Sequence, residues 1–171
     1  MKSSDTGSSS ANLSRKDRVA LFLEYEGNKR LRNLGTLLYR LTGGRFTPRN
    51  RDRDVILLTT RGRKSGREHT VLLQSFQEGS NMIIVAANSG RSSHPDWFYN
   101  LKATPTARVE SGDRSLQVRA EELSEEEAAA FWPRILQIAP GNARYRKATS
   151  RAIPLVRLVP IGPGEGTPQT S

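Results

Sequence analysis

The sequence predicts a mainly β domain with flanking helices, and three observations carry this prediction. After residue 54, apolar and polar side chains alternate over short runs, as strands with one buried face require. Turns that contain glycine separate several of these runs, as in β-hairpins. Helical spacing of apolar residues occurs only outside the runs. Short strands joined by turns form a barrel or a sandwich, and we expect a mainly antiparallel barrel.

The first element is an amphipathic helix with a basic face. From Leu31, leucines at positions 34, 38 and 41 recur at spacings of three and four, and Gly43-Gly44 ends the pattern. An earlier apolar turn, Val19–Tyr25, is expected to be separated from this helix at Gly27. The helix is expected to pack on the barrel with its charges in water. A basic amphipathic helix also permits peripheral membrane contact.

The strands follow this helix. Their sequences are rich in β-branched and apolar residues, and two hairpin turns are expected at residues 78–81 and 111–113. The six expected strands are Val55–Thr60, Thr70–Phe76, Met82–Ala87, Ala107–Glu110, Leu116–Glu121 and Ile153–Val159.

Two further helices are expected between the later strands. One follows His94-Pro95, because proline is tolerated in the first turn of a helix. The other begins at Ser124, whose hydroxyl can cap the backbone N–H of Glu127 while the Glu127 side chain reaches back. Pro133 is expected to kink or divide this second helix, because it lacks a backbone donor.

Length and composition indicate one domain. The chain has 171 residues, and the domain is expected to span residues 15–160. The serine-rich residues 1–14 are expected to be a disordered lead, and the Gly- and Pro-rich residues 161–171 a disordered tail. The chain has no cysteine, which excludes disulfides and thiolate sites and favours a cytoplasmic location. With only two histidines, no metal site is expected.

The charge is strongly positive, at +10. Nucleic acid, an anionic membrane surface and an acidic small molecule all fit this charge. The sequence has no nucleophile elbow and no glycine-rich phosphate loop of the common types. These absences favour an enzyme whose cofactor carries the chemistry.

A basic turn separates the first two expected strands. Gly62-Arg63-Lys64-Ser65-Gly66 places two cations and a hydroxyl between two glycines. Glycine at both ends is expected to let the backbone turn through positive φ, and the side chains between supply hydrogen-bond donors. Such a turn can hold a phosphate or a carboxylate. An ordinary solvated loop is the alternative interpretation.

Several motifs in this order resemble the deazaflavin-dependent nitroreductase family. They are the basic turn, Ala86–Gly90, Pro95–Leu101 and Ala103–Pro105, and the resemblance extends over roughly residues 54–160. It implies the split β-barrel of the flavin and deazaflavin oxidoreductases, with coenzyme F420 as the cofactor.

The resemblance also implies roles for individual residues. In the family the basic turn holds the anionic tail of the cofactor, which assigns Arg63, Lys64 and Ser65 to the tail. Tyr145 matches a tyrosine of the substrate pocket, where it could donate a proton to a developing anion. The other implied cofactor contacts are His69, Thr70, Val71, Leu72, Leu73, Gln74, Ala86, Ala87, Asn88, Ser89, Asp96, Trp97, Phe98, Tyr99 and Asn100.

Some of these residues have a simpler interpretation, and some depart from the family pattern. Trp97 and Phe98 could be core aromatics, and Tyr145 could be a surface residue. His69 stands where the family commonly has arginine, and Leu72 where it has proline. Ala139 and Asn142 stand where further tyrosines are common, which argues against nitroimidazole-type activity.

We therefore expect an oxidoreductase that transfers a hydride from reduced F420 to a small electrophilic acceptor, such as a quinone, a nitro compound or an enone. Nucleic acid is not the expected partner. One alternative is a non-catalytic module that binds an anionic ligand. Another is an FMN enzyme on the same barrel, and the basic turn, which suits a long anionic tail, favours the deazaflavin.

Overall fold

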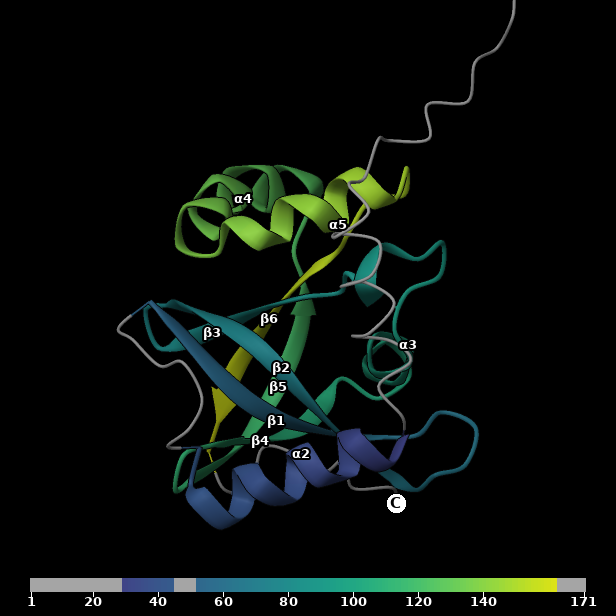
Figure 1. Ribbon diagram of the computed structural model, residues 1–171, viewed down its shortest axis with the longest axis vertical. Helices are drawn as coiled ribbons and strands as arrows, with labels where there is room; N and C mark the ends of the chain where they lie inside the picture. The colour runs from purple at the N-terminus through teal and green to yellow at the C-terminus, as the bar shows by residue number, and fades with distance from the viewer. Residues whose placement is uncertain (1–28, 45–51, 163–171) are drawn as a thin grey trace, which may run out of the picture.

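The computed structural model describes residues 29–44 and 52–162 (Figure 1). Its six strands form a closed barrel with the neighbour order β1-β2-β3-β6-β5-β4, and every pairing is antiparallel. The predicted barrel is therefore confirmed, and each predicted strand overlaps an observed one. The strands are β1 (Arg53–Arg61), β2 (Glu68–Glu78), β3 (Asn81–Val85), β4 (Thr106–Ser111), β5 (Arg114–Glu122) and β6 (Leu155–Ile161).

Two apolar clusters hold the barrel together. The first fills the barrel interior with side chains such as Ile56, Leu58 and Val118, each fully buried, and the helical aromatics Trp97 and Phe98 complete it. The second cluster joins one end of the barrel to a helix, and it includes Phe76, Leu155, Trp132 and Ile135. Because burial of apolar surface is the main stabilising term of a fold, these clusters fix the positions of the flanking helices.

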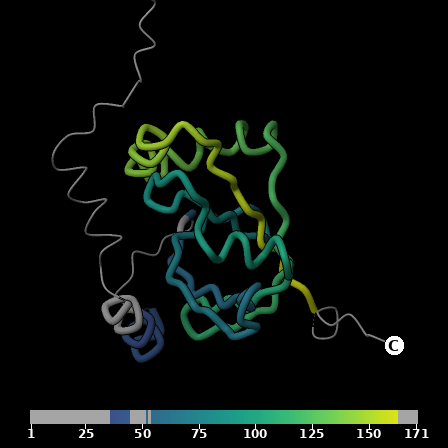
Figure 2. The backbone as a smooth tube through the Cα atoms, turned by 90° about the vertical axis from the view of Figure 1, so that its right-hand side faces the viewer, coloured from purple at the N-terminus to yellow at the C-terminus, as the bar shows by residue number. Residues whose placement is uncertain are grey.

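The helices lie around the barrel rather than inside it. They are α2 (Lys29–Thr42), α3 (Asp96–Ala103), α4 (Glu125–Ile138) and α5 (Ala143–Ala148), with 3-10 turns η1 (Asn88–Gly90) and η2 (Pro140–Asn142). Figure 1 shows α4 and α5 together at one end of the barrel, α2 at the other end, and α3 along one side. The view turned by 90° in Figure 2 agrees with this arrangement.

The helix predictions are mostly confirmed. Ser124 forms the expected capping box with Glu127. Helix α4 is not divided at Pro133, however, but continues through it to Ile138. Packing of Trp132 and Ile135 against the barrel end stabilises the helix on both sides of the proline. The short helix α5 was not predicted from the sequence.

Helix α2 is attached to the barrel through a tyrosine. Tyr39 is 4% exposed, and its hydroxyl donates to the Val55 carbonyl at 2.6 Å and accepts from the Gly112 N–H at 3.0 Å. Arg40 adds an ion pair with Glu110 at 2.7 Å. The helix thus packs on the barrel as expected. Its leucines Leu37, Leu38 and Leu41 are nevertheless exposed.

Some sequence predictions lie outside the described residues. These are the apolar turn at residues 19–25, its boundary at Gly27, and the lead at residues 1–14. The predicted tail begins one residue too early, because Ile161 still belongs to β6, and beyond residue 162 it lies outside the described part. Within the described ranges no helix is long and apolar enough to cross a membrane.

Candidate functional site

One edge of the barrel is open where β2 extends beyond its pairing with β3. Strand β2 pairs with β1 from Glu68 to Phe76, but with β3 only from Ser75 to Glu78. Residues 68–74 therefore have a strand on one side and none of the described strands on the other. Strand edges offer unpaired backbone donors and acceptors to a ligand. This edge is the centre of the candidate site.

The residues of this open edge alternate between the core and the surface. Val71 and Leu73 pack against the barrel interior, whereas Leu72 is 39% exposed. Thr70 shares a hydrogen bond with Thr59 at 2.8 Å. Core-facing side chains cannot reach a ligand outside the barrel, so Val71 and Leu73 could serve one only through their backbone groups.

The basic turn begins directly before this edge. Gly66 has φ +66°, as expected for a turn glycine, and its N–H bonds to the Gly62 carbonyl at 2.7 Å. Gly62 does not have positive φ, which corrects the expectation that both glycines do. A side chain there would stand 2.6 Å from the Ser65 hydroxyl oxygen and 2.8 Å from the His69 ring. A larger residue at position 62 would therefore displace the Ser65 and His69 side chains.

Arg63 is an exposed residue whose guanidinium nevertheless binds groups on α3. Its guanidinium lies 3.3 Å from the Asp96 carboxylate and 4.8 Å from the centre of the Tyr99 ring. It also donates to the Asn100 side-chain oxygen at 3.3 Å. A bound anion would have to share Arg63 with these partners on α3.

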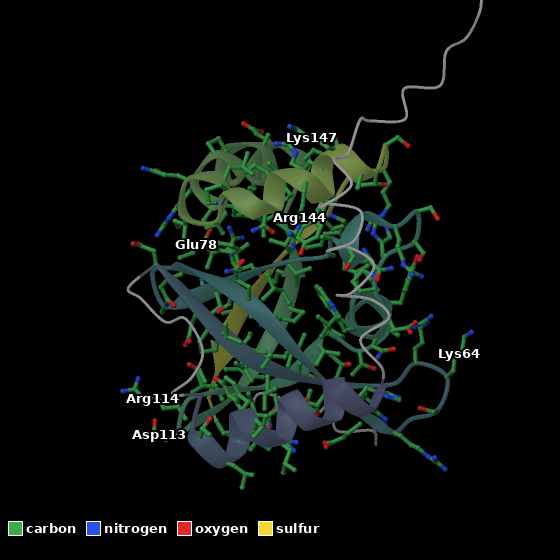
Figure 3. The ribbon with its side chains drawn as sticks, viewed as in Figure 1. Lys64, Glu78, Asp113, Arg114, Arg144 and Lys147 are labelled. Atoms are coloured by element: carbon green, nitrogen blue, oxygen red, sulfur yellow. The ribbon has the colours of Figure 1, made fainter. Side chains whose placement is uncertain are left out.

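Three other cations near the turn make no ion pair with the described residues. They are Arg61, Lys64 and Arg67, all on exposed positions. Figure 3 shows Lys64 on the outer side of the loop, far from Glu78 at the opposite end of β2. Unpaired cations attract an anion without first losing a partner. The sequence motif did not indicate Arg61 and Arg67, because they lie just outside the two glycines that bound it.

Ser65 and His69 form a contact within the turn. The Ser65 hydroxyl and the His69 Nε2 atom are 3.2 Å apart, and the hydroxyl oxygen accepts from the Arg67 N–H at 3.3 Å. Ser65 is exposed in the turn, and His69 is exposed at the start of β2.

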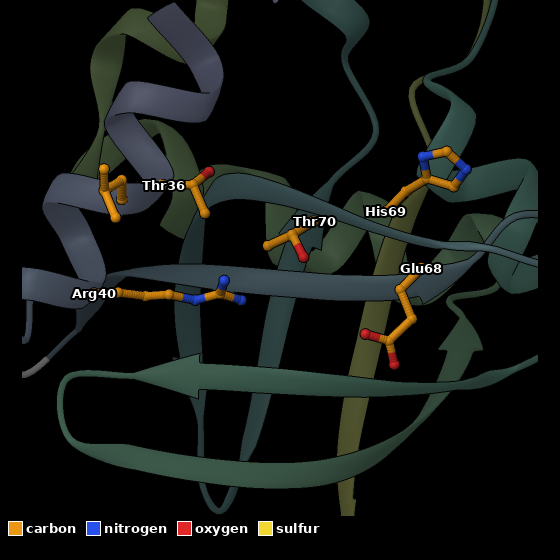
Figure 4. A pocket seen from close by; sticks show the side chains of 6 residues that line it. Thr36, Arg40, Glu68, His69 and Thr70 are labelled. Carbon is orange, nitrogen blue, oxygen red and sulfur yellow. The ribbon is translucent and has the colours of Figure 1, made fainter. Parts of the chain in front are cut away.

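A small pocket lies between α2 and the start of β2. It has a volume of about 360 Å³, and Thr36, Leu37, Arg40, Glu68, His69 and Thr70 line it. Figure 4 shows Glu68 and His69 on opposite faces of the strand, with Arg40 extending from α2 along it. Two of the predicted cofactor residues, His69 and Thr70, therefore share a cavity with α2.

Beyond the open edge, the chain that leaves β3 forms a narrow turn of small residues. Ala86 and Ala87 are buried, and Asn88 and Ser89 have positive φ values of 47° and 53°. Such left-handed conformations in non-glycine residues are uncommon and occur often at functional sites. The Asn88 side chain donates to the Ser93 carbonyl at 2.9 Å and so closes the loop.

Helix α5 packs directly on this turn. A Cβ on Gly90 would stand only 2.4 Å from the Ala148 Cβ and 3.4 Å from the Tyr145 carbonyl oxygen. The structure thus brings Tyr145 to the same end of the barrel as residues 86–89. The Tyr145 hydroxyl accepts from Arg144 at 3.1 Å, and the Arg144 guanidinium lies 5.0 Å from the Tyr145 ring centre.

The residues before α5 reach the open edge itself. Asn142 is buried, and its amide lies 3.4 Å from the Gln74 side-chain oxygen and 3.2 Å from the Ala139 carbonyl. Gln74 is the last residue of the unpaired part of β2. The contact therefore covers the end of the open edge that is nearest to β3. Asn142 and Ala139 are both buried here, and their side chains are smaller than the tyrosines that the family resemblance implies at these positions.

The α3 residues of the predicted site have different environments. Trp97 and Phe98 are each 5% exposed and belong to the barrel core, which leaves little surface for a ligand. Asp96 has a highly exposed side chain, and Tyr99 lies beneath Arg63. Asn100 is 4% exposed, and its amide group bonds both to the basic turn and to Thr60. Asn100 therefore orients the turn.

The described residues contain no group of three or more His, Cys, Asp or Glu side chains that could hold a metal ion. The site instead combines an open strand edge, unpaired cations at one end and a turn of small residues beside a tyrosine at the other. This arrangement suits an extended ligand with an anionic group at the end beside the basic turn.

Comparisons with known proteins identify the family of the chain. A family model described as F420H(2)-dependent quinone reductase matches residues 31–160. The F420H(2)-dependent quinone reductase Rv1261c of Mycobacterium tuberculosis (strain ATCC 25618 / H37Rv) is 30% identical over 146 residues, which are 82% of this chain and 97% of the relative.

Solved structures are similar as well. One, described as the structure of an F420-H2 dependent reductase (FDR-A), is 36% identical with a TM-score of 0.56, and the match covers 65% of this chain and 98% of that one. Another, described as a domain-swapped dimer, is 33% identical with a TM-score of 0.58, and the match covers 74% of this chain and 96% of that one.

Proposed function

The chain belongs to the F420H(2)-dependent quinone reductase family, and from this premise we propose that it binds reduced coenzyme F420 along the open edge of β2 and reduces a quinone there. The family is one of oxidoreductases. The assignment of individual residues to cofactor and acceptor is our proposal.

One observation supports this binding mode most directly. The open edge of β2 begins beside the basic turn and ends at Gln74, which contacts the segment that leads into α5. A ligand placed along the edge would have cations at its anionic end and the turn of small residues at its other end. Coenzyme F420 has this polarity, because an anionic tail follows its deazaflavin ring.

The tail end depends on charge. Lys64, Arg61 and Arg67 make no ion pair with described residues, so they can bind phosphate or carboxylate groups by charge-assisted hydrogen bonds. Ser65 in the turn and His69 at the start of β2 add further hydrogen-bonding groups. Arg63 would contribute more weakly, since Asp96 and Asn100 already bind it.

The ring end depends on shape. Ala86 and Ala87 have small side chains, and the left-handed turn at Asn88 and Ser89 follows β3, the strand that pairs with the far end of β2. When bound, the reduced deazaflavin supplies a hydride, so the protein needs only to hold both reactants, orient them and limit water. Orientation of this kind accounts for a large part of many enzymatic rate enhancements.

The acceptor is proposed to lie against Tyr145. Its hydroxyl oxygen accepts from Arg144, and a tyrosine hydroxyl can also donate its hydrogen to an oxygen of the acceptor. Reduction places negative charge on a quinone oxygen, and a donor at that point stabilises the charge or delivers a proton. Tyr145→Phe should lower kcat with little change in F420 affinity, whereas equal kcat would remove Tyr145 from this role.

The acceptor class is proposed to favour quinones over nitroimidazoles. Ala139 and Asn142 stand where related sequences commonly place tyrosines, and both are buried beside the end of the open edge that is nearest to β3. Their small side chains leave fewer hydroxyl donors around the acceptor. Substituting Asn142→Tyr should raise nitro reduction relative to quinone reduction, and a fall in both rates would contradict this view.

Fluorescence titration tests the cofactor assignment. Purified protein should bind F420 more tightly than FMN, because FMN carries one phosphate and F420 a longer anionic tail. The difference should shrink as salt rises, since screening weakens contacts between exposed charges. Equal affinity for the two cofactors at every salt concentration would favour an FMN enzyme. Tight F420 binding without turnover of any acceptor would favour a non-catalytic binding module.

A further inference from the structure

Arg151, which lies between α5 and β6, uses all five of its N–H donors inside the protein. The Nε atom donates to the Arg91 carbonyl at 2.8 Å. One terminal nitrogen contacts the His94 Nδ1 atom at 2.9 Å and the Ala152 carbonyl at 3.1 Å. The other donates to the carbonyls of Ala86 at 3.2 Å and Ala87 at 2.8 Å. A guanidinium has five donors, so none is left over.

These bonds join segments that the candidate site depends on. The carbonyls of Ala86 and Ala87 belong to the turn of small residues, and Arg91 and His94 belong to the loop that follows it. No carboxylate of the described residues forms an ion pair with Arg151. Burial lowers the pKa of Arg151, which marks a cation held by neutral carbonyl groups at a cost in desolvation.

The contact with Arg151 assigns the tautomer of His94. Arginine can only donate, so the His94 Nδ1 atom accepts and the ring hydrogen of the neutral imidazole is on Nε2. Within the described part of the chain Nε2 has no hydrogen-bond partner. The ring is half-buried and packs on Phe98, with ring centres 4.9 Å apart, and on Tyr99 at 5.8 Å.

The charged groups around His94 favour the neutral ring. Burial lowers the pKa of His94, and the nearby charge of Arg151 lowers that pKa further. Glu122 acts in the opposite direction, but its carboxylate is paired with Lys102 at 2.7 Å. Tyr99 is the remaining titratable neighbour in ring contact. At neutral pH, His94 thus presents an Nε2–H donor next to the turn of small residues.

We propose that Arg151 is a positioning residue for quinone reduction: it fixes the Ala86–Ala87 carbonyls and holds His94 as a neutral Nε2–H donor toward the ligand bound beside them. The proposal rests on the proposed function. It assigns Arg151 no direct contact with cofactor or acceptor. Its effect is transmitted through His94 and through the placement of the turn.

The first arm of the test uses the protein without cofactor. Nitrogen NMR of the two imidazole rings should show His94 as the Nε2–H tautomer with a titration midpoint below 6.5. In Arg151→Gln the tautomers should mix and the midpoint should rise. His69→Gln assigns the signals. The His69 ring, which lies at the start of β2, should keep its spectrum in the Arg151 variant.

The second arm measures turnover with reduced F420 and a soluble naphthoquinone. Arg151→Lys keeps the charge but has three donors instead of five, so kcat should fall roughly tenfold or more through misplacement of the turn. F420 affinity should change less than threefold, because the cations of the basic turn are untouched. His94→Gln, which keeps an N–H donor, should retain more activity than His94→Leu.

Arg157→Lys is the matched control. Arg157 is also a partly buried arginine with several partners, Glu78 and Glu127, but it lies on β6 outside the candidate site. This variant should lower thermal stability without changing kcat or the His94 spectrum. Full kcat in folded Arg151→Lys, or an unchanged His94 tautomer in Arg151→Gln, overturns the positioning role alone. A parent protein that does not turn over reduced F420 with any quinone overturns the proposed function as well.

Discussion

The side-chain oxygen of Asn100 accepts a hydrogen bond from the backbone N–H of Arg63 at 3.1 Å, although the two residues are 37 positions apart. The amide nitrogen of the same side chain donates to the Thr60 hydroxyl at 3.1 Å. Asn100 therefore ties helix α3 both to the end of β1 and to the basic turn. The turn is held in place by a buried amide before any ligand binds.

Asn100→Ala should remove both bonds and leave buried polar groups unpaired. We expect the free energy of unfolding to fall by about 1–3 kcal/mol, as for a buried donor that loses its partner. F420 affinity should fall as well, because the turn is no longer fixed. Gln117→Ala, at an exposed position on β5, is the control and should change neither quantity. An Asn100→Ala protein with full stability would show that the two hydrogen bonds of Asn100 are not needed to hold the turn.

Replacing Lys64 or Arg63 by alanine should affect stability differently, although the two residues are neighbours in the basic turn. Lys64→Ala should weaken F420 binding roughly two- to tenfold at low salt without loss of stability, because the side chain has no partner in the described structure. Arg63→Ala should also lower stability, since it breaks contacts with Asp96, Asn100 and Tyr99. Titration at two salt concentrations and thermal unfolding measure both effects.

Arg114 supplies the control for this comparison. It is exposed on β5, and Figure 3 places it on the side of the barrel away from Lys64. Arg114→Ala removes the same formal charge and should leave F420 affinity almost unchanged. Equal losses in the Arg114 and Lys64 variants would mean that net charge, and not a local site, attracts the cofactor.

Gly90 should tolerate substitution less well than Gly79. Both have positive φ, at +75° and +59°, so alanine strains the backbone at either position by about 1–2 kcal/mol. Only at Gly90 would the new Cβ also meet a neighbour, Ala148, at 2.4 Å. Gly90→Ala should therefore lower the free energy of unfolding by roughly 2–4 kcal/mol in total.

The difference between the two glycine variants isolates the contact between η1 and α5. Gly90→Ala should also reduce turnover, because it separates the turn of small residues from Tyr145. Thermal unfolding and kcat are measured for both proteins. Identical stability losses would show that η1 and α5 can move apart at no cost.

Glu78 should contribute to stability only above acidic pH. Its carboxylate bonds to the Arg157 guanidinium at 2.6 Å, and this hydrogen bond lowers the pKa of Glu78 below its ordinary value of 4.5. A lowered pKa in the folded state means that the contribution is complete above about pH 4.5 and is lost as the pH falls through the folded-state pKa. Thermal unfolding between pH 7 and pH 3 should follow this course.

Glu78→Gln should lower the free energy of unfolding by about 1–2 kcal/mol at pH 7 and much less at pH 3. Asp113→Asn, in the exposed turn between β4 and β5, is the control and should show little difference between the two pH values. A Glu78→Gln protein with the parent's pH dependence would place the acid sensitivity in another carboxylate.

The strands could be predicted from the sequence because their signal is local. Runs such as residues 55–60 combine β-branched residues with flanking turn residues, and Ser124 and Glu127 form a capping box whose partners are three positions apart. Helix α5 was missed because six residues with four polar side chains carry no clear period. The predicted division at Pro133 does not occur, because packing around Trp132 keeps α4 continuous through the proline.

The candidate site was predicted only in part, for a physical reason. The basic turn and the small residues 86–89 are contiguous motifs, so they are visible in the sequence. The partners that organise them are distant: Asn100 lies 37 residues from Arg63, and Arg151 lies 64 residues from Ala87. No pattern of spacing indicates such contacts. The open edge of β2 likewise depends on where β3 ends, which local propensity does not determine.

The most direct measurement is a single-turnover experiment with reduced F420 bound to the protein and a naphthoquinone added in excess. We predict that the deazaflavin absorbance returns to that of the oxidised form much faster than without protein. Reduced FMN or NADPH should not replace F420, and Tyr145→Phe should slow the step while binding stays intact. Tight binding of reduced F420 with no oxidation above the protein-free rate, for every quinone tried, would contradict this prediction.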